Sequence, residues 1–204
     1  MNPKLKVILE FIDEYKDCTL CSYCLNETKV FGRGNLNAKI AIVGEGPGKE
    51  ECQKGIPFVG PSGQLLEKIL SAINIKREDV YFTNAITCRT STSNRTPSQV
   101  ELNNCRSRLF KELSIIKPVV SLLVGSVALG TIFGPDYKIT KYHGEWLTLL
   151  SPPCFFYFPI HHPSWILHSS TEGEKLLRKR LIWEDIKRFR DDLEVFKSTK
   201  IYNE

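Results

Sequence analysis

The chain has 204 residues, of which 42% are hydrophobic and 25% charged, and it carries a formal net charge of +5 at pH 7. This composition is typical of a globular protein, and we expect residues 1–204 to form a single domain. No run of about 18 to 20 apolar residues is present, and residues 1–16 are too charged for a signal peptide. We therefore expect a soluble cytoplasmic protein with no membrane contact.

Apolar, strand-like runs alternate with amphipathic, helix-like segments along the chain. Helices are expected at residues 62–73, 97–116 and 175–190, with a short one from residue 126 and a polar, hairpin-like stretch around residues 137–150. Strands are expected at residues 39–44, 80–86, 119–125 and 155–160. The alternation is typical of βα units. It predicts an α/β fold, a three-layer α/β/α sandwich around a short, mainly parallel four-stranded sheet.

The helix expected at residues 175–190 holds much of the excess positive charge. Apolar residues recur there at intervals of three and four, so one face is predicted to pack on the core while the basic residues face solvent. A polyanionic partner is the alternative that the net charge permits. The apolar residues concerned are Ile186, Phe189, Leu193 and Phe196.

Glycine-rich or polar positions follow each of the four predicted strands. These are residues 44–48 (GEGPG), Asn84, Gly125 and residues 161–164 (HHPS). In an open parallel sheet the ligand binds outside the carboxyl ends of the strands. We therefore expect these positions to line one pocket.

Seven cysteines in a cytoplasmic protein call for a comparison of their spacing. Cys18 and Cys21 form a C-x2-C pair, Cys88 follows the second strand, and Cys105 lies in the next helix. Four thiolates can hold one metal centre. Spacing alone leaves structural zinc, an iron–sulfur cluster and scattered buried thiols all open. We interpret the remaining cysteines as buried and free, namely Cys24, Cys52 and Cys154.

Five motifs, together with the four spaced cysteines, occur in one order between residues 18 and 167. They are GEGPG with the following Glu50-Glu51, GIPFVG at residues 55–60, YFTNAITC at 81–88, NRTP at 94–97 and HPS at 162–164. In this combination the chain resembles the family 4 uracil-DNA glycosylases. The resemblance implies base excision repair: hydrolysis of the N-glycosidic bond of deoxyuridine in DNA, release of free uracil and an abasic site left behind.

The resemblance also implies a cofactor and a partner. In that family the corresponding cysteines hold a four-iron four-sulfur (4Fe-4S) cluster, which here would be ligated by Cys18, Cys21, Cys88 and Cys105. The cluster would be structural and would tie the amino-terminal segment to the rest of the domain. The expected partner is uracil-containing DNA, and we expect a monomer.

Excision of uracil builds positive charge on the sugar and negative charge on the departing base, so the site must stabilise both. His162 is the candidate donor to the uracil oxygen that gains charge. The neighbouring His161 leaves open which imidazole faces inward. Glu45 is expected to orient water or stabilise the sugar cation. Gly46 stands where many related glycosylases carry an acidic residue, so catalysis is expected to depend on stabilising the leaving base.

Four residues are expected to bind the flipped-out uracil. Asn84 would read its pairing edge, because an amide held in one orientation matches uracil and not cytosine. Phe58 would stack on the ring, and Gly44 would let the backbone approach closely. By the resemblance, Glu51 lies near the C5 edge and excludes the thymine methyl group.

The segment after the HPS motif is interpreted as the loop that enters the DNA stack. The expected DNA contacts are Pro163, Ser164, Ile166 and Leu167. Two departures from the family pattern bear on DNA affinity: His168 replaces an arginine, and Thr90-Ser91 replace a proline pair. Two other functions remain open, a uracil-DNA binding protein without turnover and a nucleotide-processing enzyme on a similar fold. Release of uracil from DNA separates the three.

Overall fold

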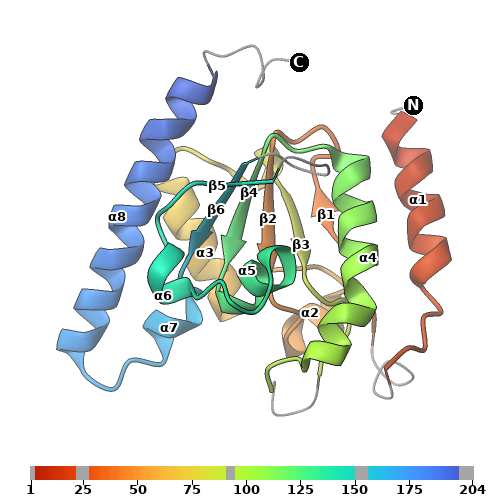
Figure 1. Cartoon of the computed structure of the whole chain (residues 1–204), viewed down its shortest axis with the longest axis horizontal. Coiled ribbons are helices and arrows are strands. Elements are labelled where there is room, and N and C mark those ends of the chain that lie inside the picture. Colours follow the sequence, from red (N-terminus) through yellow and green to blue (C-terminus); the bar gives the residue numbers. More distant parts are fainter. Residues whose placement is uncertain (1–2, 22–27, 91–94, 150–155, 198–204) are drawn as a thin grey trace.

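The computed structural model describes residues 3–21, 28–90, 95–149 and 156–197. Its strands form one mixed sheet in the order β1-β3-β2-β4-β6-β5 (Figure 1). The four inner strands are parallel, and the two outer ones are antiparallel to their neighbours. The strands are β1 (Arg33–Gly34), β2 (Ile40–Gly44), β3 (Tyr81–Asn84), β4 (Val120–Val124), β5 (Leu147–Thr148) and β6 (Phe156–Ile160).

The predicted parallel core of four strands is confirmed, but the sheet has six strands, and the predicted number was wrong. The inner strands are buried on both faces, as expected of apolar runs covered by helices. The two additional strands have only two residues each and lie at the edges. β1 pairs with β3, and β5 forms a hairpin with β6. Such short segments carry no hydrophobic alternation that could predict them.

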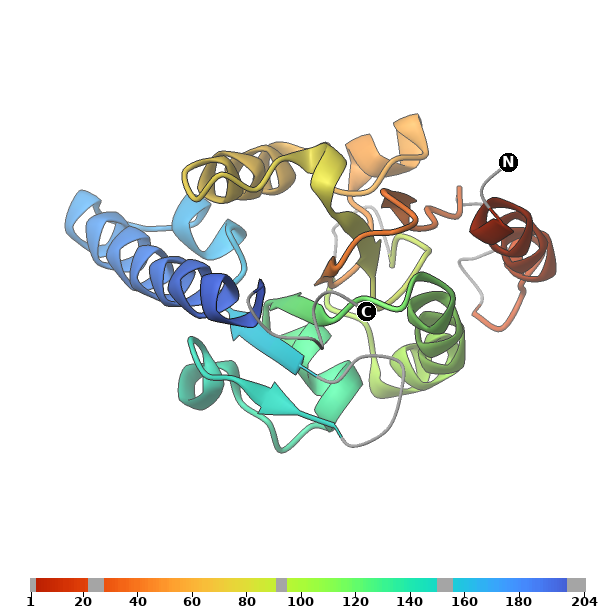
Figure 2. The ribbon, with the colours of Figure 1, turned by 90° about the horizontal axis from the view of Figure 1, so that it is seen from above.

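Helices cover both faces of the sheet and complete the predicted three layers (Figure 2). On one face, α3 and α8 pack through apolar residues such as Leu66 and Phe189, and on the other α4 and α5 pack through residues such as Leu109 and Leu129. The helices in the described part of the chain are α1 (Pro3–Tyr15), α2 (Lys49–Lys54), α3 (Pro61–Ser71), η2 (Arg77–Asp79, 3-10), α4 (Gln99–Ile116), α5 (Ser126–Phe133), α6 (Ile139–Tyr142), α7 (Ser164–Leu167) and α8 (Glu172–Lys197).

Helix α4 has clear start and stop signals. Ser98 caps its amino terminus by accepting a hydrogen bond from the backbone N–H of Glu101, and the Glu101 carboxylate accepts one from Ser98 N in return. Lys117 ends the helix in the left-handed conformation, with φ of 56°. This fixed helix matters for the site, because its buried side chains contact β3.

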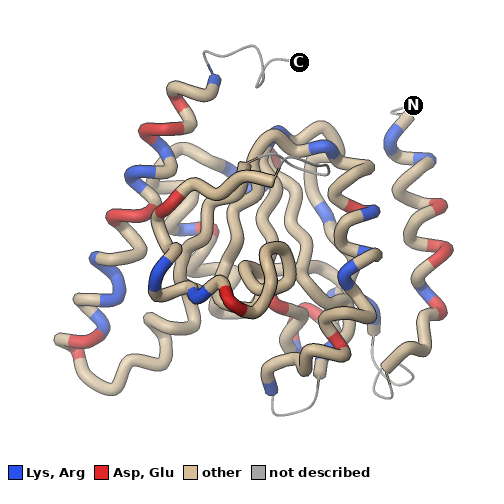
Figure 3. The backbone as a smooth tube through the Cα atoms, in the orientation of Figure 1, with Lys and Arg blue, Asp and Glu red and all other residues tan. Residues whose placement is uncertain are grey.

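Helix α8 confirms the predicted amphipathic pattern, since Ile186, Phe189 and Leu193 are buried. Its basic residues alternate with acidic ones along the exposed face (Figure 3), and Arg180 and Arg188 form ion pairs with Glu184 and Glu145. The pairing reduces the net field of this face. None of the described helices is long and apolar enough to cross a membrane.

Candidate active site

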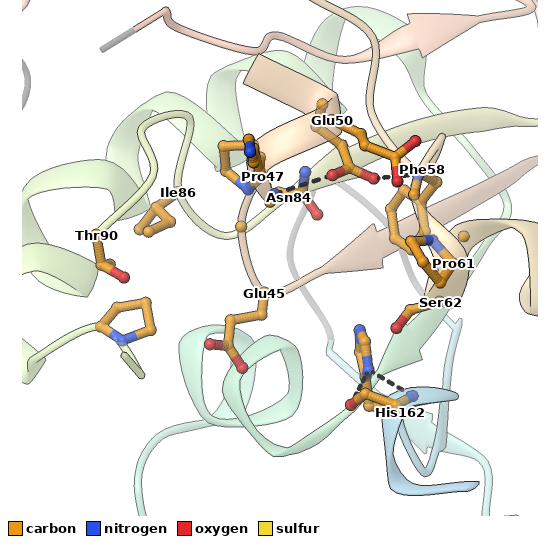
Figure 4. Close-up of a pocket in the computed structure, with 18 of the residues that line it drawn as sticks. Glu45, Pro47, Glu50, Phe58, Pro61, Ser62, Asn84, Ile86, Thr90 and His162 are labelled. Atoms are coloured by element: carbon orange, nitrogen blue, oxygen red, sulfur yellow. Dashed lines mark hydrogen bonds between the residues drawn. The ribbon is translucent and has the colours of Figure 1, made fainter. Parts of the chain in front are cut away.

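A cavity of about 570 Å³ opens at the carboxyl ends of the parallel strands. Its walls come from the segments that follow β2, β3 and β6 and from the segment between α2 and α3. Figure 4 shows Glu45, Phe58, Asn84 and His162 around this space. The expectation that the strand exits meet at one pocket is therefore confirmed. Gly125 lies against His162, because a Cβ atom added there would be 3.0 Å from the Cβ of His162.

The loop after β2 runs beside the residues that follow β3. Backbone N–H groups of Ala85 and Ile86 donate to the carbonyls of Gly44 and Glu45, at 2.8 and 3.1 Å. A side chain at Gly44 would collide with Asn84 Oδ1 and with the Phe58 ring, and one at Gly46 would collide with Ile86. Glycine is needed at both places because of this close packing and not because of a positive φ.

Glu45 lines the cavity, and burial raises the pKa of its carboxyl. Glu51 also lines it, but its two oxygens accept backbone hydrogen bonds from Gly48 (3.1 Å), Val59 (3.0 Å) and Gly60 (2.7 Å). This carboxylate therefore joins the loop after β2 to the segment that carries Phe58.

Phe58 adopts the left-handed conformation with φ of 57°, which is strained for a side chain of this size. Arg77 stabilises this conformation. Its guanidinium donates to the carbonyls of Phe58 (3.2 Å) and Pro57 (2.6 Å), pairs with Glu67 at 2.8 Å, and lies over the Phe82 ring. The Phe58 ring packs on Phe82, with centroids 5.3 Å apart, and forms one wall of the cavity.

Asn84 is the last residue of β3 and is 4% exposed. Its backbone pairs in register with Gly44 of β2. The residue lines the cavity (Figure 4), and its Oδ1 lies against Gly44, where an added Cβ atom would be only 2.4 Å away. Its amide offers the cavity a donor and an acceptor.

The hydrogen bonds of His162 define its tautomer. Its Nδ1 accepts from the backbone N–H of Ser164 at 3.1 Å, and it lies 2.7 Å from the Ser164 hydroxyl. A nitrogen that accepts a backbone N–H carries no proton, so in the neutral ring the proton is on Nε2. Burial lowers the pKa of His162 to about 4, and the nearby His168 adds to the effect. The imidazole is therefore a neutral Nε2–H donor near pH 7.

His161 belongs to a different group of side chains. Its ring stacks on Trp165 with centroids 4.1 Å apart and lies 4.6 Å from His143, whose Nδ1 is bound to Asp185 at 2.9 Å. Burial lowers the pKa of His161 to about 4, and the nearby His143 and Arg178 add to the effect. Of the two histidines, His162 lines the cavity.

The segment after the HPS motif forms a one-turn helix, α7. The side chain of Ile166 is only 3% exposed and belongs to the core packed against α3 and α8, whereas Leu167 is 47% exposed. Pro163 is buried at the start of the helix, and Ser164 lines the cavity and binds His162. Among the four residues expected to contact DNA, Leu167 is thus the apolar side chain on the surface.

Three of the four spaced cysteines converge. The buried side chains of Cys21 and Cys88 pack together, and both lie close enough to Cys105 to affect its thiol electrostatically. Asn104 Nδ2 lies 3.6 Å from Cys21 Sγ. Cys18, the other member of the pair, is partly exposed. In the part of the chain that the structure describes, no group of three or more potential ligands surrounds a single metal-ion position.

The other cysteine predictions are tested only in part. Cys52 lies in α2 and is partly buried. Cys24 and Cys154 fall outside the described residues, as do residues 91–94 of the polar loop, which include the first residue of the NRTP motif.

Sequence reasoning did not find two arginines that support the cavity from behind. Arg77 holds the Phe58 segment, and Arg108 of α4 reaches the carbonyl groups at the end of β3. Neither belongs to a motif, and each contacts residues about twenty positions away in sequence. Arg95, which forms an ion pair with Glu101, and Lys49 of α2 also line the cavity.

The fold and the site place the chain in a known class. A family model described as the uracil DNA glycosylase superfamily matches residues 31–187, which span β1 through most of α8 and include every wall of the cavity.

Individual relatives narrow this class. A type-4 uracil-DNA glycosylase of Thermotoga maritima is 38% identical over 184 residues, which cover 89% of this chain and 92% of the relative. One from Sulfurisphaera tokodaii is 32% identical, and the match covers 92% of this chain and 84% of the relative. One from Archaeoglobus fulgidus is 41% identical, and the match covers 61% of this chain and 62% of the relative. The chain belongs to the type-4 family of the uracil-DNA glycosylase superfamily.

Proposed function

We propose that this protein excises uracil from DNA by hydrolysing the N-glycosidic bond of deoxyuridine, as a monofunctional DNA repair glycosylase that leaves an abasic site. The observation that carries the proposal is the meeting of three groups at one cavity: a neutral Nε2–H donor on His162, the amide of Asn84, and the ring of Phe58. Together they supply leaving-group stabilisation, base reading and stacking.

His162 acts on the departing base. As the glycosidic bond breaks, negative charge collects on a uracil oxygen, and a donor fixed in advance stabilises it by up to about 3 kcal/mol. Ser164 keeps the His162 proton on Nε2 because its backbone N–H occupies Nδ1. No proton needs to be transferred from the ring for this stabilisation.

Asn84 and Phe58 recognise the base after it leaves the helix. The Asn84 amide donates to the carbonyl at C4 of uracil and accepts from the N3–H group, and cytosine presents the reverse pattern. Phe58 stacks on the base, and its backbone is held by Arg77. Glu51 keeps the Phe58 segment against the loop after β2, at the edge where a thymine methyl group would need space.

Glu45 acts on the sugar side. Its carboxylate stabilises the sugar cation and orients the attacking water, while Gly46 supplies only backbone. Because burial raises the pKa of Glu45, its carboxylate loses charge at a higher pH than that of an exposed glutamate. Gly44 keeps the loop close to the base.

Contacts with DNA fall to the residues around α7. We propose that Leu167 fills the gap left by the flipped nucleotide and that Pro163 and Ser164 shape and contact the phosphate backbone. Ile166 supports Leu167 from the core.

We further propose that Cys18, Cys21, Cys88 and Cys105 hold a structural 4Fe-4S cluster. The donor set fits this group. Each of the four cysteine thiolates would bind one iron of the cluster, and the convergence of Cys21 and Cys88 beside Cys105 agrees with such a ligand set.

A glycosylase assay tests the proposed function. Oligonucleotides bearing uracil opposite guanine, opposite adenine and in single strands are incubated with excess protein, and abasic sites are then cleaved with alkali. We expect cleavage at uracil and none in matched thymine oligonucleotides, with strong loss in Asn84→Ala. Tight binding of uracil-DNA without any abasic product would contradict the proposal and indicate a binding protein.

A further inference from the structure

Behind the cavity, Arg108 and Glu112 form an ion pair one turn apart on α4. Arg108 Nη1 lies 2.6 Å from Glu112 Oε2, and the two residues are only 2% and 0% exposed. Burying both charges costs several kcal/mol per ion, and such a pair often adds little to stability compared with apolar residues of the same volume. A buried pair of this kind therefore points to a role other than stability.

The second guanidinium nitrogen of Arg108 binds the backbone of Asn84, the residue proposed to read the base. Nη2 donates to the carbonyl of Asn84 at 2.6 Å and to the carbonyl of Ala85 at 3.1 Å. The sheet register between β2 and β3 ends at Asn84, so these carbonyl groups lie where the regular strand pairing stops. Arg108 therefore fixes the two peptide groups that follow the Asn84 Cα atom.

Glu112 extends this attachment to the rest of β3. It accepts hydrogen bonds from the Tyr81 hydroxyl at 2.9 Å and from Thr83 Oγ1 at 2.6 Å, and one from the backbone N–H of Gly32 at 2.8 Å. The pair thus contacts four of the five residues from 81 to 85 through a single helix turn. It holds both the side of β3 facing α4 and the direction in which its last residue points.

We propose that Arg108 is a positioning residue for base recognition: by holding the carbonyls of Asn84 and Ala85 it fixes the orientation of the Asn84 amide toward the pairing edge of the flipped base. The inference rests on the proposed function. The orientation of the amide matters because uracil and cytosine present donor and acceptor in opposite order along the pairing edge. An amide rotated by half a turn would therefore no longer prefer uracil to cytosine. Cys105 lies one turn earlier on the same helix, so α4 joins the proposed cluster ligand to Asn84.

Lysine cannot replace Arg108 in this role. A guanidinium reaches Glu112 with one nitrogen and the two carbonyls with the other, whereas an ammonium is a single point of charge on a flexible chain. We expect Arg108→Lys to lower single-turnover excision of uracil by at least about tenfold, since small misplacements at a site have effects of this size. Arg106→Lys is the matched control, because Arg106 is exposed on the same helix.

A double-mutant cycle with Asn84→Ala separates positioning from a general structural role. If Arg108 acts through Asn84, Arg108→Lys has less than about a twofold effect in the Asn84→Ala background. An equal fold-loss in both backgrounds, or no loss in the otherwise wild-type protein, would overturn the proposal. Urea unfolding and iron analysis serve as controls that the compared proteins are folded and contain equal amounts of iron.

Two further measures keep the test decisive. If Arg108→Lys does not fold, Arg108→Met combined with Glu112→Gln removes both charges, keeps an acceptor for Tyr81 and Thr83, and enters the same cycle. If the wild-type protein releases no uracil, the proposed function fails. The cycle is then measured as the ratio of dissociation constants for uracil-containing and uracil-free DNA, with the same criterion for Arg108.

Discussion

His162 carries its proton on Nε2, because the Ser164 backbone N–H occupies Nδ1. We expect His162→Ala to lower single-turnover excision by at least about tenfold, since one fixed donor to a developing anion is lost. His161→Gln is the control, because its ring packs on Trp165 and not in the cavity. Near-normal excision by His162→Ala would remove this residue from the mechanism.

Glu45 should set the acid limb of the pH profile. Its carboxylate has to be charged to stabilise the sugar cation, and burial raises its pKa above the ordinary value, so the rate falls as the pH falls through that pKa. His162, with a pKa of about 4, is still neutral in this range. Single-turnover rates measured as the pH is lowered from about 8 should show the limb in the wild type and a low, flat profile in Glu45→Gln. An unchanged limb in that variant would assign it to another group.

Gly44 tests how closely the site is packed. We expect Gly44→Ala to reduce excision by at least about tenfold, because the new methyl group would displace Asn84 Oδ1 or the Phe58 ring. Gly130→Ala in α5 is the control: nothing lies within 4 Å of its added Cβ, and alanine favours the helix. Equal activity of the two variants would show that the loop can shift without consequence.

At the scale of elements, the helices and strands that could be predicted are those marked by a local pattern in the sequence. The inner strands were found because runs such as residues 40–44 and 120–124 are mostly apolar, and α4 because its pattern of apolar residues is a local signal. Strand β1 was missed because its two exposed residues become a strand only through pairing with β3. Helices α1, α2 and α7 were not predicted either, since two of them have at most six residues.

The difference between local sequence patterns and contacts between distant segments also explains which site residues could be predicted. Glu45, Asn84 and His162 each follow a strand, so their meeting point is a consequence of strand order. Arg77 and Arg108 act through contacts between distant segments, and a charged residue within a helix is ordinarily assigned to solvent. Their roles depend on packing that no local pattern encodes.

The two neighbouring apolar residues of helix α7 have different expected roles: exposed Leu167 enters the DNA, and buried Ile166 supports it. We expect Leu167→Ala to weaken excision from duplex DNA while the free energy of unfolding changes by less than about 0.5 kcal/mol, because this side chain is largely exposed. Ile166→Ala should instead cost about 2 to 5 kcal/mol of stability, since it leaves a cavity in the core. Urea unfolding and duplex excision rates measured together distinguish them. A stability loss in Leu167→Ala would show that both residues are structural.

At the scale of the whole molecule, the amino-terminal segment is attached to the domain at two places. Helix α1 lies beside α4 (Figure 1), with Phe11 buried and Lys4 Nζ donating to the carbonyl of Ile116 at 2.6 Å. The second attachment is the proposed cysteine ligand set, in which Cys21 packs on Cys88 beside Cys105. The first alone is a small contact through one helix face.

Loss of the proposed cluster should therefore loosen this end of the molecule. We expect the wild type to be brown with about four irons per chain, and Cys105→Ser to lose iron and visible absorption, melt at a lower temperature and be cleaved first near residue 21 by a protease. Cys52→Ser is the control, because Cys52 lies in α2 outside the proposed ligands. Without the cluster, the segment is held by the packing of α1 on α4, the Lys4 hydrogen bond and the Glu14–Lys111 ion pair, and proteolysis measures how firmly. A colourless wild type containing zinc, or equal melting of both variants, would overturn the assignment of the cluster as a structural tie.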